Sequence, residues 1–361
     1  MATIPEMIEV EKKVILPPRL RAVPRKKPIR RPDKDYSQVL RFAIQTAFLL
    51  LNAAIGLQFY LFAHYFESGG QSLRVARPAG VDGWLPIGGI MNLKYFIETG
   101  NFPRVHPAAM LLLLAFLLIS ILFRKAFCGW LCPIGTISEG LWKLGRKLLR
   151  MNWRLPRWVD LALRSLKYIL LGLFVYAVAG LSAAAIQAFL ESPYGLVSDV
   201  KMLNFFRFMG SATAITLMVL AVLSVMIKNF WCRYLCPYGA LMGLASLLSP
   251  TRIRRVPDWC IDCAKCAHAC PALLAVDKSI TVRSAECTAC LECVAVCPAQ
   301  GALRISIPTR RTIPPWALAA GIAAIFLGVV ICAKLAGIWR TNIPDVVYFY
   351  LGPRAQQFVH P

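Results

Sequence analysis

CIDCAKCAHACP at residues 260–271 and CTACLECVAVCP at residues 287–298 are two copies of one pattern, C-x2-C-x2-C-x3-C-P. Three closely spaced thiolates on one loop can reach three corners of a metal–sulfur cubane, and a cysteine from the other copy can supply the fourth. Thiolates are soft ligands that select iron–sulfur clusters or zinc over hard cations. The two runs therefore predict a compact, cysteine-ligated metal domain around which the rest of the chain is organised.

This spacing is the one found in bacterial ferredoxins with two clusters, in which the fourth cysteine of each run ligates the other cluster. We therefore predict two [4Fe–4S] clusters in a domain spanning residues 251–311. The first would be held by Cys260, Cys263, Cys266 and Cys297, and the second by Cys287, Cys290, Cys293 and Cys270.

A zinc ribbon and a disulfide scaffold are the alternative uses of so many cysteines. Zinc ribbons need two C-x2-C pairs, four cysteines in all, whereas this segment has two runs of four that each end in Cys-Pro. Disulfide scaffolds are typical of small secreted domains, and this segment lies within a long hydrophobic chain. The sequence therefore favours the two-cluster domain over both alternatives.

The composition indicates a membrane protein. Of the 361 residues, 58% are hydrophobic and only 16% are charged, while the formal net charge is +23. A soluble domain has about 45–50% apolar and about 25% charged residues. A basic chain can also bind nucleic acid, but the basic residues here flank apolar stretches, so membrane topology explains them better and no nucleic-acid partner is expected.

Five apolar stretches are long enough to cross a hydrocarbon core of about 30 Å, which needs about 20 helical residues. They are residues 39–65, 107–127, 166–190, 211–229 and 315–338. Of the 41 Lys and Arg residues, 32 lie in segments 1–41, 124–167 and 228–314. Because Lys and Arg accumulate in cytoplasmic loops, we expect the N-terminus and the ferredoxin domain in the cytoplasm and the C-terminal tail outside.

The predicted fold class is an α-helical polytopic membrane protein with about five transmembrane helices, two repeated hairpins and an inserted α+β ferredoxin domain. The expected location is the bacterial inner membrane, with several spans. The expected segments are a disordered basic cytoplasmic tail (1–37), a four-helix membrane domain (38–250), the ferredoxin domain (251–311), a fifth transmembrane helix (312–340) and an extracytoplasmic tail (341–361).

An internal repeat lies within the membrane domain. FCGWLCPIGTISEGL at 127–141 matches WCRYLCPYGALMGLA at 231–245, and each copy follows a pair of predicted spans. A parallel repeat with an even number of spans places both copies on the same side of the membrane. Here that side is the cytoplasmic one, which also carries the ferredoxin domain.

Each copy of the repeat carries a C-x3-C-P motif. The pairs Cys128/Cys132 and Cys232/Cys236 are spaced i, i+4, which places both sulfurs on one helix face. The proline that follows each pair is expected to end or kink the helix. If the two copies pack around a pseudo-twofold axis, the four cysteines form one site. Such a site can hold a third metal centre or cycle between dithiol and disulfide; the i, i+4 spacing favours redox thiols or a labile metal over a permanent cubane. Buried structural thiols are the alternative.

Histidine is scarce in the chain. His64 is expected near the outer end of the first span and His106 near the outer start of the second. Two imidazoles at one level can ligate a b-type haem or contact a quinol. The simpler interpretation is that each lies at the water boundary and is solvated. Cys332 in the last span is expected to be a small core residue.

The two C-x3-C-P motifs, CIDCAKCAHACP and CTACLECVAVCP together resemble the NapH/NosR-type membrane polyferredoxins, over roughly residues 38–310. This resemblance implies membrane electron transfer linked to the quinone pool, with cytoplasmic clusters. NosR-type proteins carry a large extracytoplasmic flavin-binding domain, whereas this chain passes from a short basic tail to the first span. NapH-type proteins have four spans, and a fifth is predicted here.

Two functions of different class follow. The first is an oxidoreductase component that relays electrons between the quinone pool and an unidentified redox protein, with quinol as substrate and the C-x3-C-P thiols as an intermediate station. The second is a metal-handling (copper-reducing) or redox-sensing membrane ferredoxin, since paired thiols suit Cu(I). The scarcity of Met-rich or His-rich tracts favours the first. The partners expected are membrane lipid, quinone and the redox protein.

Overall fold

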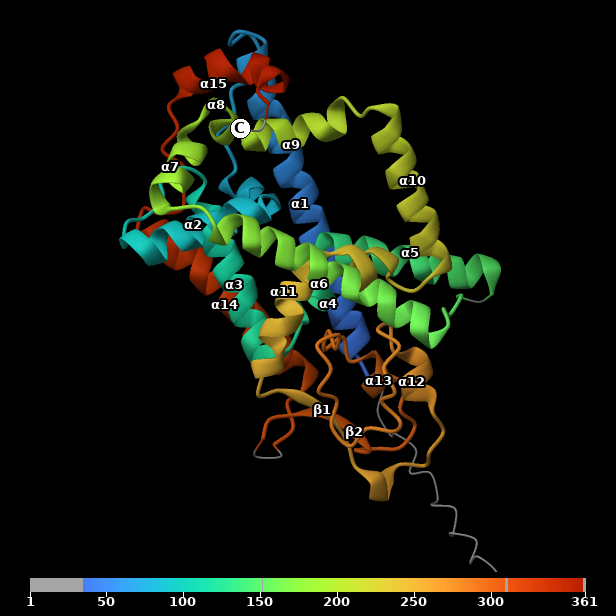
Figure 1. Cartoon of the computed structure of the whole chain (residues 1–361). Coiled ribbons are helices and arrows are strands. Elements are labelled where there is room, and N and C mark those ends of the chain that lie inside the picture. The colour runs from blue at the N-terminus through green and yellow to red at the C-terminus, as the bar shows by residue number, and fades with distance from the viewer. Residues whose placement is uncertain (1–34, 151, 309–310, 360–361) are drawn as a thin grey trace, which may run out of the picture.

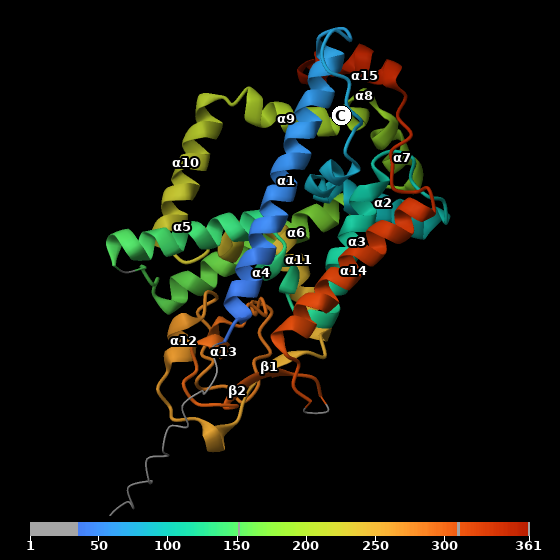
Figure 2. The ribbon, with the colours of Figure 1, turned by 180° about the vertical axis from the view of Figure 1, so that it is seen from behind.

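The computed structural model describes residues 35–150, 152–308 and 311–359. Helices dominate this part of the chain, and the cysteine-rich segment lies at one end of the molecule with a two-stranded sheet (Figure 1). The predicted basic tail lies, except for its last three residues, outside the described residues. Helix α1 (Ser37–Glu67) runs from the cysteine-rich end to the opposite end, as both views show (Figure 2).

The remaining helices follow in chain order. They are η1 (Ala79–Trp84), α2 (Pro86–Thr99), α3 (Pro107–Phe123), α4 (Ala126–Trp130), α5 (Pro133–Leu149), α6 (Arg157–Ala179), α7 (Ala183–Glu191), α8 (Pro193–Leu196), α9 (Ser198–Arg207), α10 (Ser211–Met226), η2 (Trp231–Leu235), α11 (Pro237–Ala245), η3 (Ser246–Leu248), η4 (Pro257–Trp259), α12 (Lys265–Ala269), α13 (Glu292–Ala295), α14 (Pro315–Leu335), α15 (Asp345–Leu351) and η5 (Gly352–Gln357).

Among the described residues, three helices are long and apolar enough to cross a membrane: α1, α6 and α14. A fourth span is possible if α9 and α10 are counted together, although they meet at 79°. The chain is therefore mostly helical with three or four candidate membrane spans. The count of five remains a prediction.

The differences from the predicted spans have local causes. The predicted span 166–190 is interrupted after α6, because Ser182 caps a new helix by accepting a hydrogen bond from the Ala185 N–H (3.2 Å). The predicted span 107–127 ends as a helix at Phe123, because the positive φ of Arg124 (63°) cannot continue a right-handed helix. The 17-residue α3 is shorter than a full span and is largely buried.

The two repeat copies exchange their packing partners. Helix α5 of the first copy packs on α10 of the second, and α11 of the second packs on α3 of the first. The helices that precede each copy also correspond: α1 packs against α4 and α5, while α6 packs against η2 and α11. This reciprocal packing gives the membrane domain a pseudo-twofold arrangement in which neither copy buries its apolar surface alone.

The contact between α5 and α10 depends on a glycine. A Cβ atom built on Gly145 would lie 1.9 Å from the backbone oxygen of Val225. Since a backbone atom cannot move aside as a flexible side chain does, only glycine allows the two helices this separation.

Two strands close the cysteine-rich segment on itself. β1 (Arg252–Arg255) pairs antiparallel with β2 (Leu303–Ser306), with Arg252 opposite Ser306. The short helices α12 and α13 each begin inside one of the cysteine runs. One continuous cluster of buried side chains extends from α3 and α14 through Trp130 to Leu291 and Ile305. The cysteine-rich domain and the membrane helices therefore share one core.

Replacement of Gly145 by Ala should destabilise the protein by about 1–3 kcal/mol, the usual effect of overpacking a buried contact. The expected result is a clearly lower apparent Tm of the purified protein in detergent, followed by tryptophan fluorescence.

Gly140 in the same helix provides the matched control, because nothing lies within 4 Å of its added Cβ. Gly140→Ala should be neutral or stabilise by up to about 1 kcal/mol, as at an open helical site. Equal Tm values for the two variants would show that α5 and α10 do not pack as closely as described.

Candidate metal centres and an adjoining thiol cavity

The two cysteine runs have the same unusual backbone. Asp262 and Ala264 in the first run, and Ala289 and Leu291 in the second, all have positive φ angles between 49° and 60°. In each run these residues stand two and four positions after the first cysteine. Non-glycine residues adopt this conformation at a cost of about 1–2 kcal/mol each. Alternation of right- and left-handed residues turns successive N–H groups inward, and such concave loops hold anions and iron–sulfur clusters.

The structure brings the eight cysteines together in the two predicted sets. One small cavity is lined by Cys260, Cys263, Cys266 and Cys297, and a second one by Cys270, Cys287, Cys290 and Cys293. Each cavity thus receives three cysteines from one run and one from the other. Within the described residues no three His, Cys, Asp or Glu side chains are close enough to hold a single metal ion, whereas a cubane requires ligands spread around its corners. The residues fit a [4Fe–4S] cluster in each cavity.

The two cavities differ in their access to solvent. All four cysteines of the second set are buried, whereas Cys263 of the first set is exposed. Trp259, close to the first set in sequence, is also half exposed. The first set therefore lies at the surface, and the second faces the membrane domain.

The loop of the second set lies directly on the first C-x3-C-P motif. Trp130, between Cys128 and Cys132, is fully buried and donates its indole N–H to the Ala289 carbonyl (3.0 Å). A Cβ on the neighbouring Gly129 would lie 2.7 Å from the Thr288 oxygen. The motif residues and the cluster loop are therefore in contact without any side chain between their backbones.

Buried ion pairs hold this loop from the side of α1. The Arg41 guanidinium, 2% exposed, donates to both Glu139 oxygens (2.8 and 2.6 Å) and to Glu292 (2.9 Å). Gln38 donates to the Cys290 carbonyl (3.0 Å). Burial alone would raise the pKa of Glu139, but its hydrogen bond to Arg41 lowers it to about 2. Glu139 is therefore an anion at neutral pH.

A second set of ion pairs holds the loop from the side of α6. Lys167, fully buried, lies 2.5 Å from Glu286, the residue before Cys287, and Lys125 lies 3.6 Å from the same carboxylate. Burial alone would raise the pKa of Glu286, but Lys125 and Lys167 together hold it below its usual value. Since α6 corresponds to α1 in the repeat, the loop is fixed by cations from both halves.

These charged residues are not predicted from the sequence as part of the site. In the sequence, Arg41, Lys125 and Lys167 indicate only topology. The available signal was the position of Glu286 and Glu292, each directly before a cluster cysteine.

In both C-x3-C-P motifs the second cysteine caps a helix. The sulfur of Cys132 accepts a hydrogen bond from the Gly135 N–H (3.4 Å), and that of Cys236 from the Gly239 N–H (3.2 Å). Pro133 and Pro237 occupy the first helical position, where the missing N–H has no consequence. The expected break is present, because α4 and η2 end shortly before these prolines, and the prolines also begin the next helices, α5 and α11.

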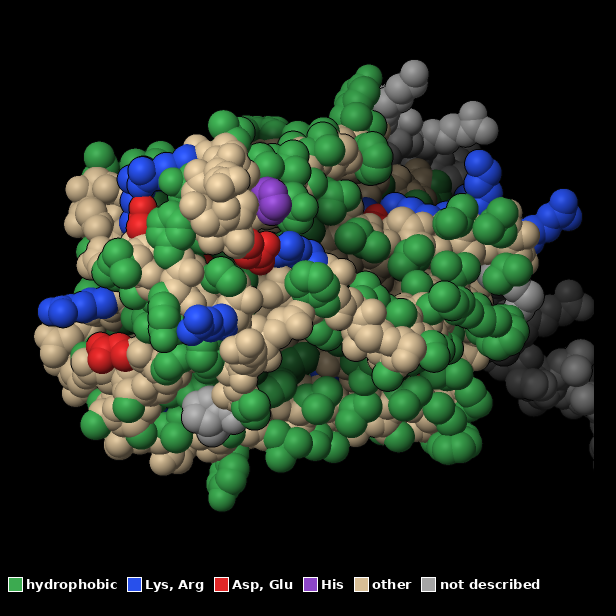
Figure 3. Space-filling model, turned by 90° about the horizontal axis from the view of Figure 1, so that it is seen from above, with side chains coloured by type: hydrophobic (Ala, Val, Ile, Leu, Met, Phe, Trp, Pro, Cys, Tyr) green, Lys and Arg blue, Asp and Glu red, His purple; other side chains and the backbone are tan. Residues whose placement is uncertain are grey.

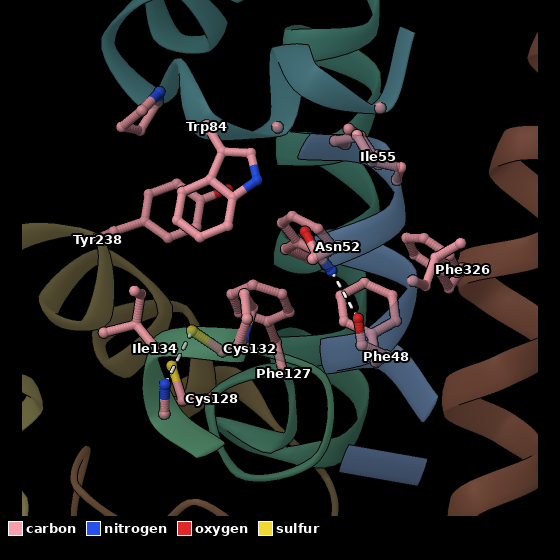
Figure 4. Close-up of a pocket in the computed structure, with 18 of the residues that line it drawn as sticks. Phe48, Asn52, Ile55, Trp84, Phe127, Cys128, Cys132, Ile134, Tyr238 and Phe326 are labelled. Carbon is pink, nitrogen blue, oxygen red and sulfur yellow. Dashed lines mark hydrogen bonds between the residues drawn. The ribbon is translucent and has the colours of Figure 1, made fainter. Parts of the chain in front are cut away.

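All four C-x3-C-P cysteines line one cavity of about 530 Å³. Cys128 lies in α4 and Cys232 in the π-helical turn η2, so the first cysteines of the pairs come from short segments before the caps. Figure 4 shows Cys128 and Cys132 at one end of the cavity, below Phe127 and Tyr238. The structure thus places the two repeat copies around a common space.

A lysine ammonium lies at the cysteine end of this cavity. A Cβ built on Gly239 would lie 3.4 Å from the Cys236 sulfur and 3.5 Å from Nζ of Lys125. Lys125 is 3% exposed and also faces Glu286. It therefore stands between the thiols and the loop of the second cluster set.

Most of the remaining lining is apolar and aromatic, with Lys334 of α14 as a further cationic wall residue. The cavity walls come from α1, α3, η1 and α14 and include Phe48, Phe116, Trp84 and Phe326. Asn52 is a polar wall residue, and its amide donates to the Phe48 carbonyl (2.8 Å). This shape and lining suit a flat ring with an apolar tail.

The two histidines do not form a haem site. His106 is buried, not solvated as expected, and both of its ring nitrogens have protein partners: Nδ1 lies 3.0 Å from Asp82, and Nε2 lies 3.2 Å from the Gly195 oxygen. His64 is exposed and stacks on Tyr60. Cys332, expected in the core, is exposed on α14.

Family models of iron–sulfur domains match most of the cysteine-bearing regions. A 4Fe-4S binding domain matches residues 105–152 and 209–255, the two repeat copies, and a 4Fe-4S dicluster domain matches residues 252–298. No solved structure matches the chain.

The chain is 47% identical over 326 residues to the YccM protein of Escherichia coli (strain K12), covering 89% of this chain and 91% of that protein. It is 34% identical over 148 residues to the regulatory protein NosR of Pseudomonas aeruginosa, covering 41% of this chain and 19% of NosR. It is 29% identical over 199 residues to the ferredoxin-type protein NapH of Haemophilus influenzae, covering 51% and 64%. The chain therefore belongs to the NapH/NosR-type family of iron–sulfur electron-transport proteins with candidate membrane helices.

Proposed function

We propose that this protein is an oxidoreductase component that relays electrons between the quinone pool and a redox protein. In this proposal the 530 Å³ cavity receives the quinol ring. Clusters bound by the two cysteine sets would accept and pass on single electrons. The chain's own residues hold the ring, position the cluster loop and keep water out of the route between them.

One observation carries this proposal: the same short motif touches both the cavity and the cluster loop. Cys128 and Cys132 line the cavity, while Trp130, between them, donates a hydrogen bond to Ala289 in the loop of the second set. A carrier seated in the cavity and a cluster in that loop would thus be separated by one layer of buried side chains.

The difference in exposure supports an order for the relay. The second set, Cys270, Cys287, Cys290 and Cys293, is buried against the membrane domain and would receive the electron first. The first set, Cys260, Cys263, Cys266 and Cys297, is nearer to solvent, with Cys263 exposed, and would pass the electron to the partner protein.

The environment of the thiols favours a redox role. The Lys125 ammonium beside Cys236 stabilises a thiolate or a reduced, anionic quinone. We therefore favour redox thiols at Cys128, Cys132, Cys232 and Cys236 over metal handling.

The proposed setting is the bacterial inner membrane, in contact with lipid, with residues 251–311 in the cytoplasm and residues 341–361 outside. The split of basic residues between the predicted loops supports this orientation. A phosphatase fused after residue 361 should then be active, and a fluorescent protein fused there should be dark. The reverse pair of results would contradict the orientation.

The ligand sets and the order of the relay can be tested with one pair of variants. Wild-type protein should contain about eight iron and eight acid-labile sulfide per chain, as two [4Fe–4S] clusters require. Cys270→Ser and Cys297→Ser should each lose about half. A short-chain ubiquinol, added anaerobically, should still give an EPR signal from the remaining cluster in Cys297→Ser but not in Cys270→Ser, although dithionite reduces the remaining cluster in both.

Three results would contradict these assignments. About two zinc ions and no iron would exclude the clusters. If ubiquinol reduced the remaining cluster in Cys270→Ser but not in Cys297→Ser, the order of the two clusters in the relay would be the reverse of the one proposed. If dithionite reduced the clusters of the wild-type protein but neither ubiquinol nor menaquinol did, the quinol link would be refuted.

The thiols should be needed for electron entry and not for cluster binding. Cys132→Ser and Cys236→Ser should slow ubiquinol-driven cluster reduction at least about tenfold, because the cavity would lose a redox thiol, while the dithionite-reduced EPR signals stay unchanged. Cys332→Ser is the matched control, since Cys332 is an exposed cysteine on α14 away from the cavity lining. Wild-type rates of cluster reduction in both cavity variants would show that these thiols do not take part in electron transfer to the clusters.

A further inference from the structure

A group of ionisable side chains lies buried at the end of the molecule opposite the cysteine-rich domain. Arg77, Asp82, His106, Asp199 and Tyr348 contact one another there, and Asp82 and Asp199 have no exposed surface. Seen from that end, acidic and basic side chains lie among hydrophobic ones over the left and middle of the face (Figure 3). Buried ionisable groups are costly in a membrane protein and often mark proton routes.

This group separates two cavities. The short helix η1 lines the large apolar cavity with Ala79, Gly80, Gly83 and Trp84, and it also carries Asp82. On the other side, Arg77, Ala79 and Tyr348 line a second cavity of about 430 Å³. Exposed Arg340, together with Arg74 and Asp345, connects that second cavity to the surface.

His106 has a hydrogen-bond partner in either protonation state. Nε2 lies 3.2 Å from the Gly195 carbonyl, to which a protonated Nε2 donates, and 3.2 Å from the Ser198 hydroxyl, which can donate or accept. Nδ1 lies 3.0 Å from the Asp82 carboxylate and 3.1 Å from an Arg77 N–H. A protonated Nδ1 donates to Asp82, and a deprotonated Nδ1 accepts from Arg77. The proton at Nδ1 can therefore leave and return without an unsatisfied buried nitrogen.

One carboxylate oxygen of Asp82 is available to accept a proton. Its Oδ1 contacts Arg77 and His106, while Oδ2 is buried and has no hydrogen-bond partner among the described residues. The charged groups that face His106 are Asp82 from η1, Arg77 from the preceding loop and Asp199 from α9. Burial alone would lower the pKa of His106, but the Asp82 carboxylate raises it overall.

We propose that Asp82 and His106 form a proton-transfer site that carries the protons of quinol oxidation from the apolar cavity to the face opposite the clusters. The inference rests on the proposed function. Oxidation of one quinol breaks two O–H bonds and yields the quinone, two electrons and two protons. Clusters held by the two cysteine sets would take up one electron each. The protons pass one at a time over Asp82 and Nδ1 of His106 and leave past Tyr348.

Proton release in vesicles tests the site. Cluster-loaded protein is reconstituted into vesicles containing a pH-sensitive dye, and molecules with the cysteine-rich domain outward are selected. An anaerobic pulse of short-chain ubiquinol should reduce both clusters, seen by EPR, and acidify the vesicle interior by about two protons per quinol.

Asp82→Asn and His106→Gln should abolish the interior acidification and slow cluster reduction, whereas dithionite-reduced EPR signals stay unchanged. Asp82→Glu should restore part of the acidification. His64→Gln is the matched control, because His64 is exposed and outside the buried group, and it should behave as wild type.

Two results would overturn the proton-transfer site and leave the proposed function standing. One is release of the protons on the side of the clusters, and the other is unchanged interior acidification in both Asp82→Asn and His106→Gln. Failure of ubiquinol to reduce the wild-type clusters would overturn both.

A second measurement does not depend on cluster activity or on the folding of these variants. Deuterium exchange at C2–H of the histidines in the wild-type protein should show His106 titrating with a pKa above the usual 6.5. If His106 does not titrate between about pH 5 and 9, its role is only to hold the loops in place by hydrogen bonds, and the proposal fails.

Discussion

The buried ion pairs around the loop before and within the second cysteine run are the constraint on which the arrangement of this protein depends. Glu286 and Glu292 would each be strongly unfavourable beside a hydrophobic core without a cation. Lys167 from α6 and Arg41 from α1 supply one each, at 2.5 and 2.9 Å. These two helices precede the two repeat copies, so the loop is fixed only when both halves of the membrane domain are assembled.

The reciprocal packing of the repeat follows from the same requirement. Each C-x3-C-P helix packs on the apolar helix of the other copy, and the cysteines that cap α5 and α11 come to line one cavity. A helix whose first turn is set by a Cys cap and a Pro at the first position has its N–H groups directed at the sulfur. The local cap therefore fixes where each sulfur lies, and the pseudo-twofold packing decides that all four face the same space.

Buried charged groups lie on both sides of the apolar cavity. Lys125 and its partners lie near the cluster loop, and the Asp82–His106 group lies at the opposite end. In a low-dielectric interior, electrostatic interactions act over longer distances than in water. Such an arrangement suits a reaction that separates electrons from protons. Cationic groups near the cluster loop stabilise the added negative charge, and the ionisable pair at the opposite end can take up protons.

The sequence by itself determined the cysteine sets, because C-x2-C-x2-C-x3-C-P is a local pattern whose spacing dictates which sulfurs share a loop. It also determined the hydrophobic character of α1 and α14 and the existence of the repeat. Only the tertiary structure decided the number of candidate spans and the roles of Arg41, Lys167 and His106. A break such as Ser182 depends on one capping hydrogen bond, and a basic residue in a chain of 41 Lys and Arg gives no sign that it pairs with an acid far along the chain. These residues act through contacts between distant segments, which composition and local spacing do not encode.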